Sequence, residues 1–206
     1  MITLEGIDGC GKTTQGRLLQ ARLEGEAIPH LFVREPGGTP IGEQIRLLLL
    51  QKEHSLITDT ELLLYLAARA ELVNTVIRPA LEDGRVVLCD RYYDSTVAYQ
   101  GYGCGGDGDW IRELNEKITA GLRPRLTFLF DLSVEEALRR RGHEGDRIEE
   151  RSLSFHRRVR RGYLALAAAE PDRIVIIDAA APAEQQHELL WSRLEALFSG
   201  RPSDEL

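Results

Sequence analysis

The residue pattern best suited to chemistry lies near the start of the chain. Residues 6–13 are Gly-Ile-Asp-Gly-Cys-Gly-Lys-Thr, which matches G-x-x-x-x-G-K-[ST]. Glycines let such a loop curl so that backbone N–H groups point at a polyphosphate, and the helix that follows adds the positive end of its dipole. Lys12 supplies a cation for the β- and γ-phosphates, and Thr13 supplies a hydroxyl for Mg²⁺. The spacing predicts a nucleoside triphosphate site made by Gly6, Ile7, Asp8, Gly9, Cys10, Gly11, Lys12, Thr13 and Thr14.

The sequence on each side of this loop has the elements that the motif requires. An apolar run at residues 2–4 predicts a strand before the loop. Leu18, Leu19 and Leu23 have helical spacing and predict a helix after it. Because strand, loop and helix agree, a chance match in a glycine-rich turn is disfavoured.

Short aliphatic runs alternate with helical patterns along the rest of the chain. This alternation predicts an α/β fold with a doubly wound five-stranded parallel sheet flanked by helices, and ligands beyond the carboxyl ends of the strands. Strands are predicted at residues 3–6, 30–34, 86–90, 126–131 and 174–178. Helices are predicted at residues 12–24, 41–50, 58–82, 109–120, 134–141, 153–169 and 183–198.

Composition limits the class of protein. The 206 residues are 29% charged and 43% hydrophobic, which is typical of one ordered globular domain. A net charge of −7 argues against a nucleic-acid or anionic-membrane surface, because such surfaces need a basic face. No apolar run is long enough to span a membrane. The three cysteines are too scattered for a disulfide framework or a metal site, so we expect a reducing cytoplasm.

The stretch after the second predicted strand is a candidate ligand loop. Residues 34–39 are Arg-Glu-Pro-Gly-Gly-Thr, and Pro-Gly-Gly forces an abrupt turn that lets a ligand approach the backbone closely. An ordinary strand-to-helix loop is the alternative. Arg46 follows in an apolar part of the next helix, where a charge needs a partner or a pocket.

The third predicted strand ends in an acid and a base. Asp90 is expected to hold Mg²⁺ directly or through water, and Arg91 to grip a phosphate with its bidentate fork. A simple Asp90–Arg91 ion pair is the alternative. Shortly afterwards, Thr96, Tyr99 and Gln100 fall near one helical face and carry hydrogen-bonding groups suited to a base and a sugar.

The predicted helix at residues 58–82 has a broad apolar face, which favours burial against the sheet and against a second subunit. Thr58 and Glu61 fit a capping box at its start. Tyr65 and Arg69 are i, i+4 neighbours that can meet one ligand together. The alternative places Tyr65 in the core and Arg69 in a surface ion pair.

A basic run at residues 139–147 lies between two predicted helices, with Gly142 and Gly145 at hinge positions. A glycine-flanked cationic loop suits a lid, because it neutralises charge and excludes water only once substrates are bound. Some of these arginines can instead be solvated. We expect a single domain at residues 1–198, with a lid at about 139–150, and a loose tail at 199–206.

These stretches, taken in order, resemble the thymidylate kinase family, which belongs to the nucleoside-monophosphate kinases among P-loop proteins. The matches are residues 5–14, 34–39, 90–92, 95–96 with 98–101, and 146–149. Many enzymes share the phosphate loop. The Arg-Glu-Pro-Gly-Gly and Ala-Tyr-Gln-Gly stretches are far more specific, and their combination carries the resemblance.

The resemblance implies a binding pocket for dTMP. Tyr65 stands where the family usually has a phenylalanine that stacks on thymine, and Arg69 matches the arginine that reads the base edge. Tyr99 matches a residue beside the sugar 2′ carbon, and Asp8 matches an acid facing the 3′-hydroxyl. The implied dTMP-binding residues are Asp8, Arg34, Pro36, Arg46, Tyr65, Arg69, Arg91, Thr96, Tyr99 and Gln100.

The resemblance also implies where the catalytic cation comes from. Some family members carry an arginine in the phosphate loop, but Gly9 and Cys10 occupy that region here, so the cation is expected from the lid, as in bacterial-type members. Arg147 lies in the matched lid motif, and Arg140 and Arg141 are nearby candidates for ATP binding. The expected catalytic residues are Lys12, Asp90, Arg91 and Arg147, with Thr13 and Asp90 as the Mg²⁺ site.

The activity that the resemblance implies is Mg²⁺-dependent transfer of the γ-phosphoryl group of ATP to dTMP, giving dTDP and ADP for dTTP biosynthesis, by a homodimer. One alternative is a P-loop kinase for another nucleotide or a small metabolite. The other is a nucleotide-dependent switch protein, which is disfavoured because the chain lacks an Asn-Lys-x-Asp guanine signature.

Overall fold

The computed structural model describes residues 1–142 and 145–199. Within these residues, five parallel strands form one sheet in the order β2–β3–β1–β4–β5, which confirms the predicted sheet. The strands are β1 (Ile2–Glu5), β2 (His30–Arg34), β3 (Val86–Asp90), β4 (Leu126–Asp131) and β5 (Ile174–Asp178). Strand order reverses on either side of β1, so a ligand crevice opens at its carboxyl end, where the phosphate loop begins.

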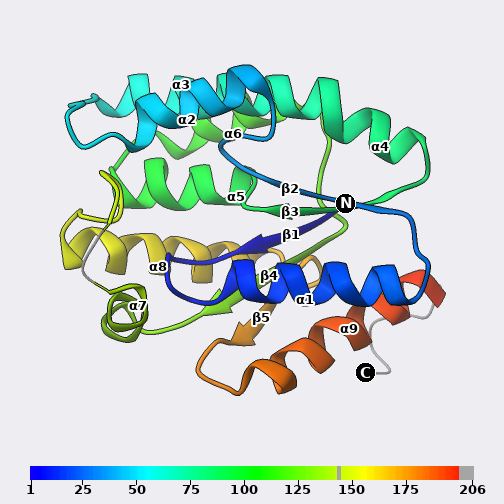
Figure 1. Cartoon of the computed structure of the whole chain (residues 1–206). Helices are drawn as coiled ribbons and strands as arrows, with labels where there is room; N and C mark the ends of the chain where they lie inside the picture. The colour runs from blue at the N-terminus through cyan, green and yellow to red at the C-terminus, as the bar shows by residue number, and fades with distance from the viewer. Residues whose placement is uncertain (143–144, 200–206) are drawn as a thin grey trace.

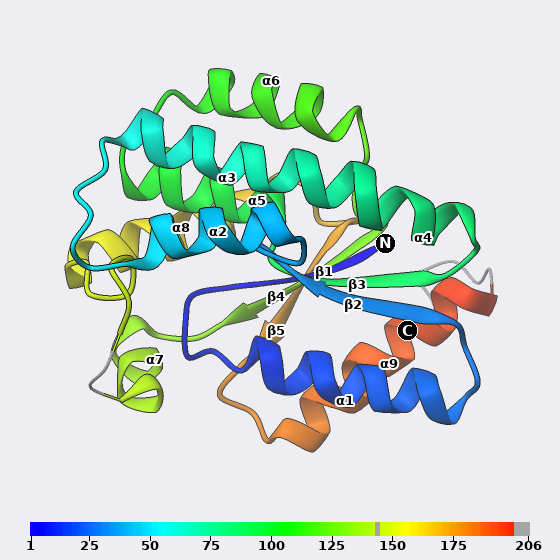
Figure 2. The ribbon, with the colours of Figure 1, turned by 45° about the horizontal axis from the view of Figure 1, so that its top comes forward.

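Helices cover both faces of the sheet (Figure 1). On one face, α1 and α9 lie side by side; on the other, α8 and α5 lie against the sheet, while α2, α3 and α6 form an outer layer (Figure 2). The α-helices are α1 (Lys12–Gly25), α2 (Pro40–Leu50), α3 (Thr58–Leu72), α4 (Arg78–Glu82), α5 (Tyr93–Thr96), α6 (Gly108–Thr119), α7 (Val134–Arg141), α8 (Leu153–Ala169) and α9 (Ala183–Ser199). Two π-helical segments, η1 (Val73–Ile77) and η2 (Val97–Gly103), continue α3 and α5.

The central strands are buried on both faces, as their continuous apolar runs predict. Ile2 and Leu4 of β1 and Phe128 of β4 are at most 1% exposed. Two polar groups share this core: Thr3, whose hydroxyl hydrogen-bonds the Thr127 hydroxyl at 2.7 Å, and Glu5, which leads into the phosphate loop. The core therefore holds the start of that loop rigidly against β3 and β4.

Three local expectations differ from the structure. The helix expected at residues 58–82 is continuous, but it passes through the wider turns of η1 before α4. The glycine-rich stretch at residues 101–108, for which its composition predicts a loop, is helical up to Gly103, where η2 ends. The first residue of the expected tail, Ser199, is the last residue of α9. The rest of the expected tail lies outside the described residues.

The prediction of a capping box at the start of α3 is wrong. The N-cap residue is Ile57, which has no side-chain acceptor, and Glu61 is fully buried. The Glu61 carboxylate turns inward because three donors from distant segments bind it there.

Every helix in the described part of the chain is too short or too polar to cross a membrane.

Candidate active site

The phosphate loop connects β1 to α1 with a backbone that only glycine adopts easily. Gly6, Gly9 and Gly11 have φ angles of +139°, +83° and +98°. A Cβ atom at Gly9 would lie 2.3 Å from the carbonyl oxygen of Ala137, and one at Gly6 would lie 2.5 Å from that of Phe130. The loop therefore packs directly against the chain, and any side chain at these two positions would push it out of place.

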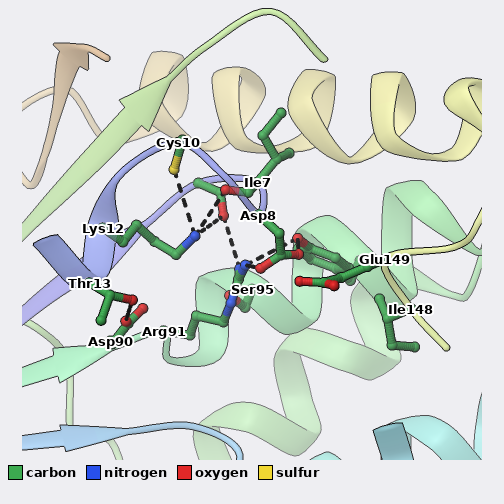
Figure 3. A network of polar contacts seen from close by, with 12 residues as sticks. Ile7, Asp8, Cys10, Lys12, Thr13, Asp90, Arg91, Ser95, Ile148 and Glu149 are labelled. Atoms are coloured by element: carbon green, nitrogen blue, oxygen red, sulfur yellow. Dashed lines mark hydrogen bonds and ion pairs between the residues drawn. The ribbon is translucent and has the colours of Figure 1, made fainter. Parts of the chain in front are cut away.

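The side chain of Lys12 lies inside the loop (Figure 3). Its Nζ donates to the carbonyl oxygens of Gly6 and Ile7, at 2.9 Å each, and lies 3.6 Å from Cys10 Sγ. Lys12 is only 6% exposed. The ammonium is thus already held at the centre of the predicted triphosphate cradle, where an incoming phosphate would meet it.

Thr13 and Asp90 meet at the open side of the loop. Thr13 Oγ1 donates to Asp90 Oδ2 at 2.9 Å, although the two residues are far apart in sequence. The pairing follows from the sheet, because β3 lies next to β1 and ends beside the first turn of α1. The two residues predicted from separate motifs to bind metal therefore form one cluster of oxygen atoms.

Arg91 lies between the phosphate loop and η2, and it has a left-handed backbone with φ +72°. Such a conformation costs a non-glycine residue about 1–3 kcal/mol. Its guanidinium compensates by donating to the Gly6 carbonyl oxygen at 2.9 Å and to Asp8 Oδ1 at 2.5 Å. Tyr99 donates its hydroxyl hydrogen to the other oxygen of Asp8 at 3.0 Å. Asp90 and Arg91 are therefore not an ion pair with each other: the partner of Arg91 is Asp8.

The pKa of Asp8 reflects this arrangement. Burial by itself raises the pKa, but the charges of Arg91 and Lys12 and hydrogen bonds from Arg91 and Tyr99 bring it well below its usual value. Asp8 is therefore ionised at neutral pH. Its carboxylate holds the Arg91 guanidinium across the end of the phosphate loop.

Behind this pair, Glu5 forms a second buried network. Its carboxylate accepts the backbone N–H of Tyr92 at 2.7 Å, the Ser95 hydroxyl at 2.6 Å and the Tyr163 hydroxyl at 2.9 Å. Burial and the charge of Asp94 raise the pKa of Glu5 to about 7, although Arg91 and the hydrogen bonds from Ser95 and Tyr92 lower it. Glu5 thus ties the end of β1 to α5 and α8.

Two cavities meet at Arg91. The loop cavity is lined by residues of the phosphate loop together with Arg34, Asp90 and Arg140. The inner cavity contains eight of the ten predicted dTMP-binding residues: Asp8, Pro36, Arg46, Tyr65, Arg91, Thr96, Tyr99 and Gln100. Both cavities share a wall made of Asp8, Glu35, Arg46, Arg91 and Glu149. A ligand bound in the loop cavity and a second ligand bound in the inner cavity would each have one end at this common wall.

The two remaining residues of the predicted dTMP set lie elsewhere. Arg34 lines the loop cavity and donates to both carboxylate oxygens of Glu43, at 3.1 and 2.9 Å. Arg69 is 1% exposed and lies behind the wall of the inner cavity. Its guanidinium binds the Glu35 carboxylate, at 2.7 Å from Nη2, and also donates to Thr96 and Asn115.

The buried partner of Arg69 is itself incompletely bonded. Among the described residues, no hydrogen-bond partner reaches Glu35 Oε1. Burial raises the pKa of Glu35, while the charge and hydrogen bond of Arg69 lower it. In this structure Arg69 acts on the inner cavity through Glu35 and Thr96, which do line it.

The predicted lid arginines take three different positions. Arg140 lines the loop cavity and donates to the carbonyl oxygen of Ala179 at 2.9 Å. Arg141 donates to the carbonyl oxygen of Glu149 at 2.7 Å. Arg147 points toward α3, where it donates to Glu61 Oε2 at 2.7 Å and to the Leu49 carbonyl oxygen at 2.8 Å. Residues 143–144 of the expected lid lie outside the described residues.

Sequence reasoning missed several acidic residues of the site. Glu5, Glu35 and Glu149 lie within the matched stretches, and that position is the signal that was available for them. Glu61 was interpreted only as a helix cap, although it lies in the same helix as Tyr65. His156 was also missed: it is buried, with its Nε2 at 3.2 Å from the Glu149 carbonyl oxygen.

Comparisons with known proteins agree with this geometry. The family model described as Thymidylate kinase matches residues 4–190. A thymidylate kinase of Symbiobacterium thermophilum is 50% identical, over 97% of this chain and 94% of its own length. One of a Synechococcus species is 53% identical, over 93% of both chains. The crystal structure of thymidylate kinase from Ehrlichia chaffeensis superposes with a TM-score of 0.78 at 35% identity, covering 94% of this chain and 97% of that one. By sequence over nearly its whole length and by fold, this chain belongs to the thymidylate kinase family.

Proposed function

We propose that this enzyme transfers the γ-phosphoryl group of ATP to the 5′-phosphate of dTMP, giving dTDP and ADP. The observation that carries the proposal is the wall shared by the two cavities. ATP bound by the phosphate loop and dTMP bound in the inner cavity would both end at Arg91. Such a meeting of two phosphate groups is what direct phosphoryl transfer needs.

The transfer is written without a covalent enzyme intermediate. An oxygen of the dTMP phosphate attacks the γ-phosphorus, and the bond from that phosphorus to the β–γ bridging oxygen breaks, so that ADP leaves. The attacking oxygen is already an anion, so no residue has to remove a proton from it. Catalysis is therefore positioning and neutralisation of charge.

Each of these tasks has candidate residues in the structure. We assign donor binding to the backbone N–H groups of residues 6–14 and to Lys12, whose ammonium lies inside the loop. Arg91 would hold the acceptor phosphate, since its guanidinium lines both cavities. Tyr65 and Gln100 line the part of the inner cavity assigned to the base.

We propose that Thr13 and Asp90 hold Mg²⁺. Their oxygen atoms, 2.9 Å apart, fit an ion that prefers oxygen ligands and retains several waters in kinase sites. When bound, Mg²⁺ would neutralise charge on the phosphate oxygens of ATP.

Arg147 remains the proposed lid cation, and this role requires a movement. Its guanidinium lies on Glu61 in the present structure, so a contact with phosphate requires the lid segment to shift when nucleotides bind. We expect Arg147→Ala to lower kcat by roughly a hundredfold, the scale of losing one charge-stabilising donor. A kcat within about threefold of the wild-type value in steady-state assays would remove Arg147 from the catalytic set. We further propose that residues 1–198 act as one kinase domain with a lid at about 139–150.

The proposed reaction is tested by a coupled ADP-release assay with ATP and a panel of acceptors. The panel contains dTMP, dUMP, dCMP, dGMP, thymidine and a few small phosphorylated metabolites. We expect dTMP to give the highest kcat/KM. A clear lead for another acceptor would replace the proposed substrate, and ADP release independent of any acceptor would favour a slow hydrolase instead.

We also propose a homodimer formed through the outer layer of helices. Apolar side chains there are exposed in the single chain: Ile41, Leu47 and Leu48 of α2, Leu63 of α3 and Trp110 of α6. An exposed apolar surface of this kind marks an interaction site. Light scattering is expected to give twice the mass of one chain, and Leu47→Glu combined with Leu63→Glu is expected to halve that mass. A wild-type mass equal to one chain would reject the dimer.

The proposed cellular location is the cytoplasm. It is supported by the three cysteines, which are all free thiols in the structure and so suit a reducing compartment.

A further inference from the structure

One buried carboxylate connects the inner cavity to the lid segment. Glu61 of α3 is fully buried. Its Oε1 accepts a hydrogen bond from Gln100 Nε2 at 2.8 Å, and its Oε2 accepts from Arg147 at 2.7 Å and from Arg151 at 2.6 Å. A single side chain therefore holds groups from η2 and from the segment that follows the lid.

These contacts determine which way the Gln100 amide faces. An ionised carboxylate only accepts hydrogen bonds, so the amide must turn its NH₂ group toward Glu61 and its carbonyl oxygen away from it. The guanidinium groups of Arg147 and Arg151 both pair with Oε2, so the buried carboxylate has two cationic partners. Among the described residues, no donor bonds Gln100 Oε1, and Gln100 lines the inner cavity.

We propose that Glu61 is a positioning residue that sets base specificity, by orienting the Gln100 amide so that a hydrogen-bond acceptor faces the base. This inference rests on the proposed function and extends it. An acceptor at this place pairs with the ring N3–H of thymine or uracil. It is mismatched with cytosine, because the ring N3 of cytosine is itself an acceptor, and two facing acceptors leave both groups without a hydrogen.

The same carboxylate helps to build the cavity wall. Arg147 and Arg151 flank the segment that contributes Ile148 and Glu149 to the inner cavity. Arg151 is also held from its other side, because its guanidinium lies 4.6 Å from the centre of the Phe155 ring. Glu61 thus fixes the orientation of the base-facing amide and anchors the wall opposite it.

The test compares Glu61→Gln with wild type in the full-length enzyme. The substitution keeps the size of the side chain but replaces an acceptor by an amide that can also donate, so the Gln100 amide can turn over. We expect the ratio of kcat/KM for dTMP to kcat/KM for dCMP to fall roughly tenfold or more, which is the scale of removing one mismatched hydrogen bond. The KM for dTMP is expected to rise, and the KM for ATP to stay within about twofold.

A matched control is Asp59→Asn, which neutralises an exposed acid in the first turn of the same helix. We expect it to leave the dTMP-to-dCMP ratio unchanged. A second variant, Gln100→Glu, presents carboxylate oxygens to both Glu61 and the base. It is expected to lose dTMP activity, whereas Gln100→Leu is expected to lower the ratio as Glu61→Gln does.

The outcomes separate this inference from the proposed function. If wild type shows no preference for dTMP in the acceptor panel, the proposed function fails. If wild type prefers dTMP and Glu61→Gln keeps the ratio within twofold, only the role of Glu61 is overturned. If Glu61→Gln proves too unstable to assay, Glu61→Asp decides, because it keeps the charge but draws the carboxylate back from Gln100: an unchanged ratio overturns the inference, and a reduced one supports it.

Discussion

The loop cavity takes six of its fourteen lining residues from one continuous stretch, the phosphate loop and the first residues of α1. The inner cavity takes its wall from the ends of β1 and β2, from α2, α3 and η2, and from the segment after α7. The surroundings of the inner cavity hold buried ion pairs, since Arg91 on its wall pairs with Asp8 and Arg69 behind its wall pairs with Glu35.

This difference shows two ways of preparing a site for phosphate. The loop cavity presents a glycine-rich backbone and the Lys12 ammonium, which is held by carbonyl oxygens rather than by an acid. At the inner cavity, Asp8 holds the Arg91 guanidinium and Glu35 holds the Arg69 guanidinium before any ligand arrives, so that less order has to be created on binding. Substitutions should therefore affect catalysis in the loop cavity and both stability and specificity in the inner cavity.

The largest expected effect comes from breaking a buried pair of the inner cavity. Arg69→Ala leaves the Glu35 carboxylate buried without its partner, and the free energy of unfolding is expected to fall by about 3–5 kcal/mol. Urea unfolding followed by circular dichroism measures it. Arg112→Ala, at an exposed ion pair of α6, serves as control and should change stability by less than about 1 kcal/mol. Equal effects of the two substitutions would contradict the description of Arg69 as a buried structural charge.

In the loop cavity, Lys12→Ala is expected to leave the fold intact and to lower kcat about a hundredfold or more. The reason is that Lys12 contacts only carbonyl oxygens and a sulfur atom of its own loop, so its loss leaves no buried acid unpaired. Steady-state kinetics and thermal unfolding test both halves of this statement. Lys117→Ala, on the surface of α6, is the matched control. A large loss of stability with unchanged kcat would reverse the contrast between the two cavities.

A smaller effect is expected for the ring of Tyr65 in the inner cavity. Stacking on a base is worth about 1–3 kcal/mol in single-strand binders, and on that scale Tyr65→Ala should raise the KM for dTMP about tenfold or more. Tyr65→Phe keeps the ring and should stay within about threefold of wild type. If the alanine variant has an unchanged KM for dTMP, Tyr65 does not belong to the base pocket.

The smallest expected effect is a pH dependence of stability behind the phosphate loop. Burial and the charge of Asp94 raise the pKa of Glu5 to about 7, from its ordinary value of 4.5 in the unfolded chain. Between these two values the folded state binds more protons at Glu5 than the unfolded state does, so its contribution to the free energy of unfolding falls as pH rises. Unfolding measured from pH 5 to pH 7 should therefore show a more negative slope for wild type than for Glu5→Gln. Equal slopes, or the opposite order, would show that the three donors around Glu5 keep its pKa low.

The acidic residue of the phosphate loop, Asp8, gives a pH dependence of stability with the opposite sign. The pKa of Asp8 is lowered chiefly by Arg91, against the effect of burial. The stability that Asp8 contributes is therefore present at neutral pH, and it is lost only as pH falls below the usual aspartate range. Asp8→Asn should remove part of the acid sensitivity below about pH 4 while leaving the Glu5 slope above pH 5 in place.

Much of the fold could be predicted because its signals are local. The strands at 30–34, 86–90, 126–131 and 174–178 agree with the structure residue for residue, since a buried parallel strand is a continuous apolar run. The first strand, predicted at 3–6, lies at Ile2–Glu5, and several helix ends differ from the prediction by one residue. The short helix α5 was not predicted, and the π-helical turns of η1 and η2 had no sequence signal.

The candidate site can be divided in the same way, into parts with local sequence signals and parts without them. The phosphate loop, the placing of Thr13 and Asp90 together, and eight of the fourteen residues that line the inner cavity were predicted from motifs, strand ends and the family resemblance. The ion pair of Arg147 with Glu61 and the buried ion pair of Arg69 with Glu35 were not predicted. Glu61 was predicted as a cap because its distance from Thr58 in sequence was visible, while its partners in η2 and after the lid were not.

By itself, then, the sequence determined the conformation of the loop that we propose binds phosphate, because glycine conformation, strand pattern and helix start all act within a few consecutive residues. Only the tertiary structure decided which carboxylate holds which arginine, because those choices depend on segments that the parallel sheet brings together from opposite ends of the chain. The charge pattern along the chain indicates that buried charged side chains need partners. The packing of α3, η2 and the lid segment determines which partners they have.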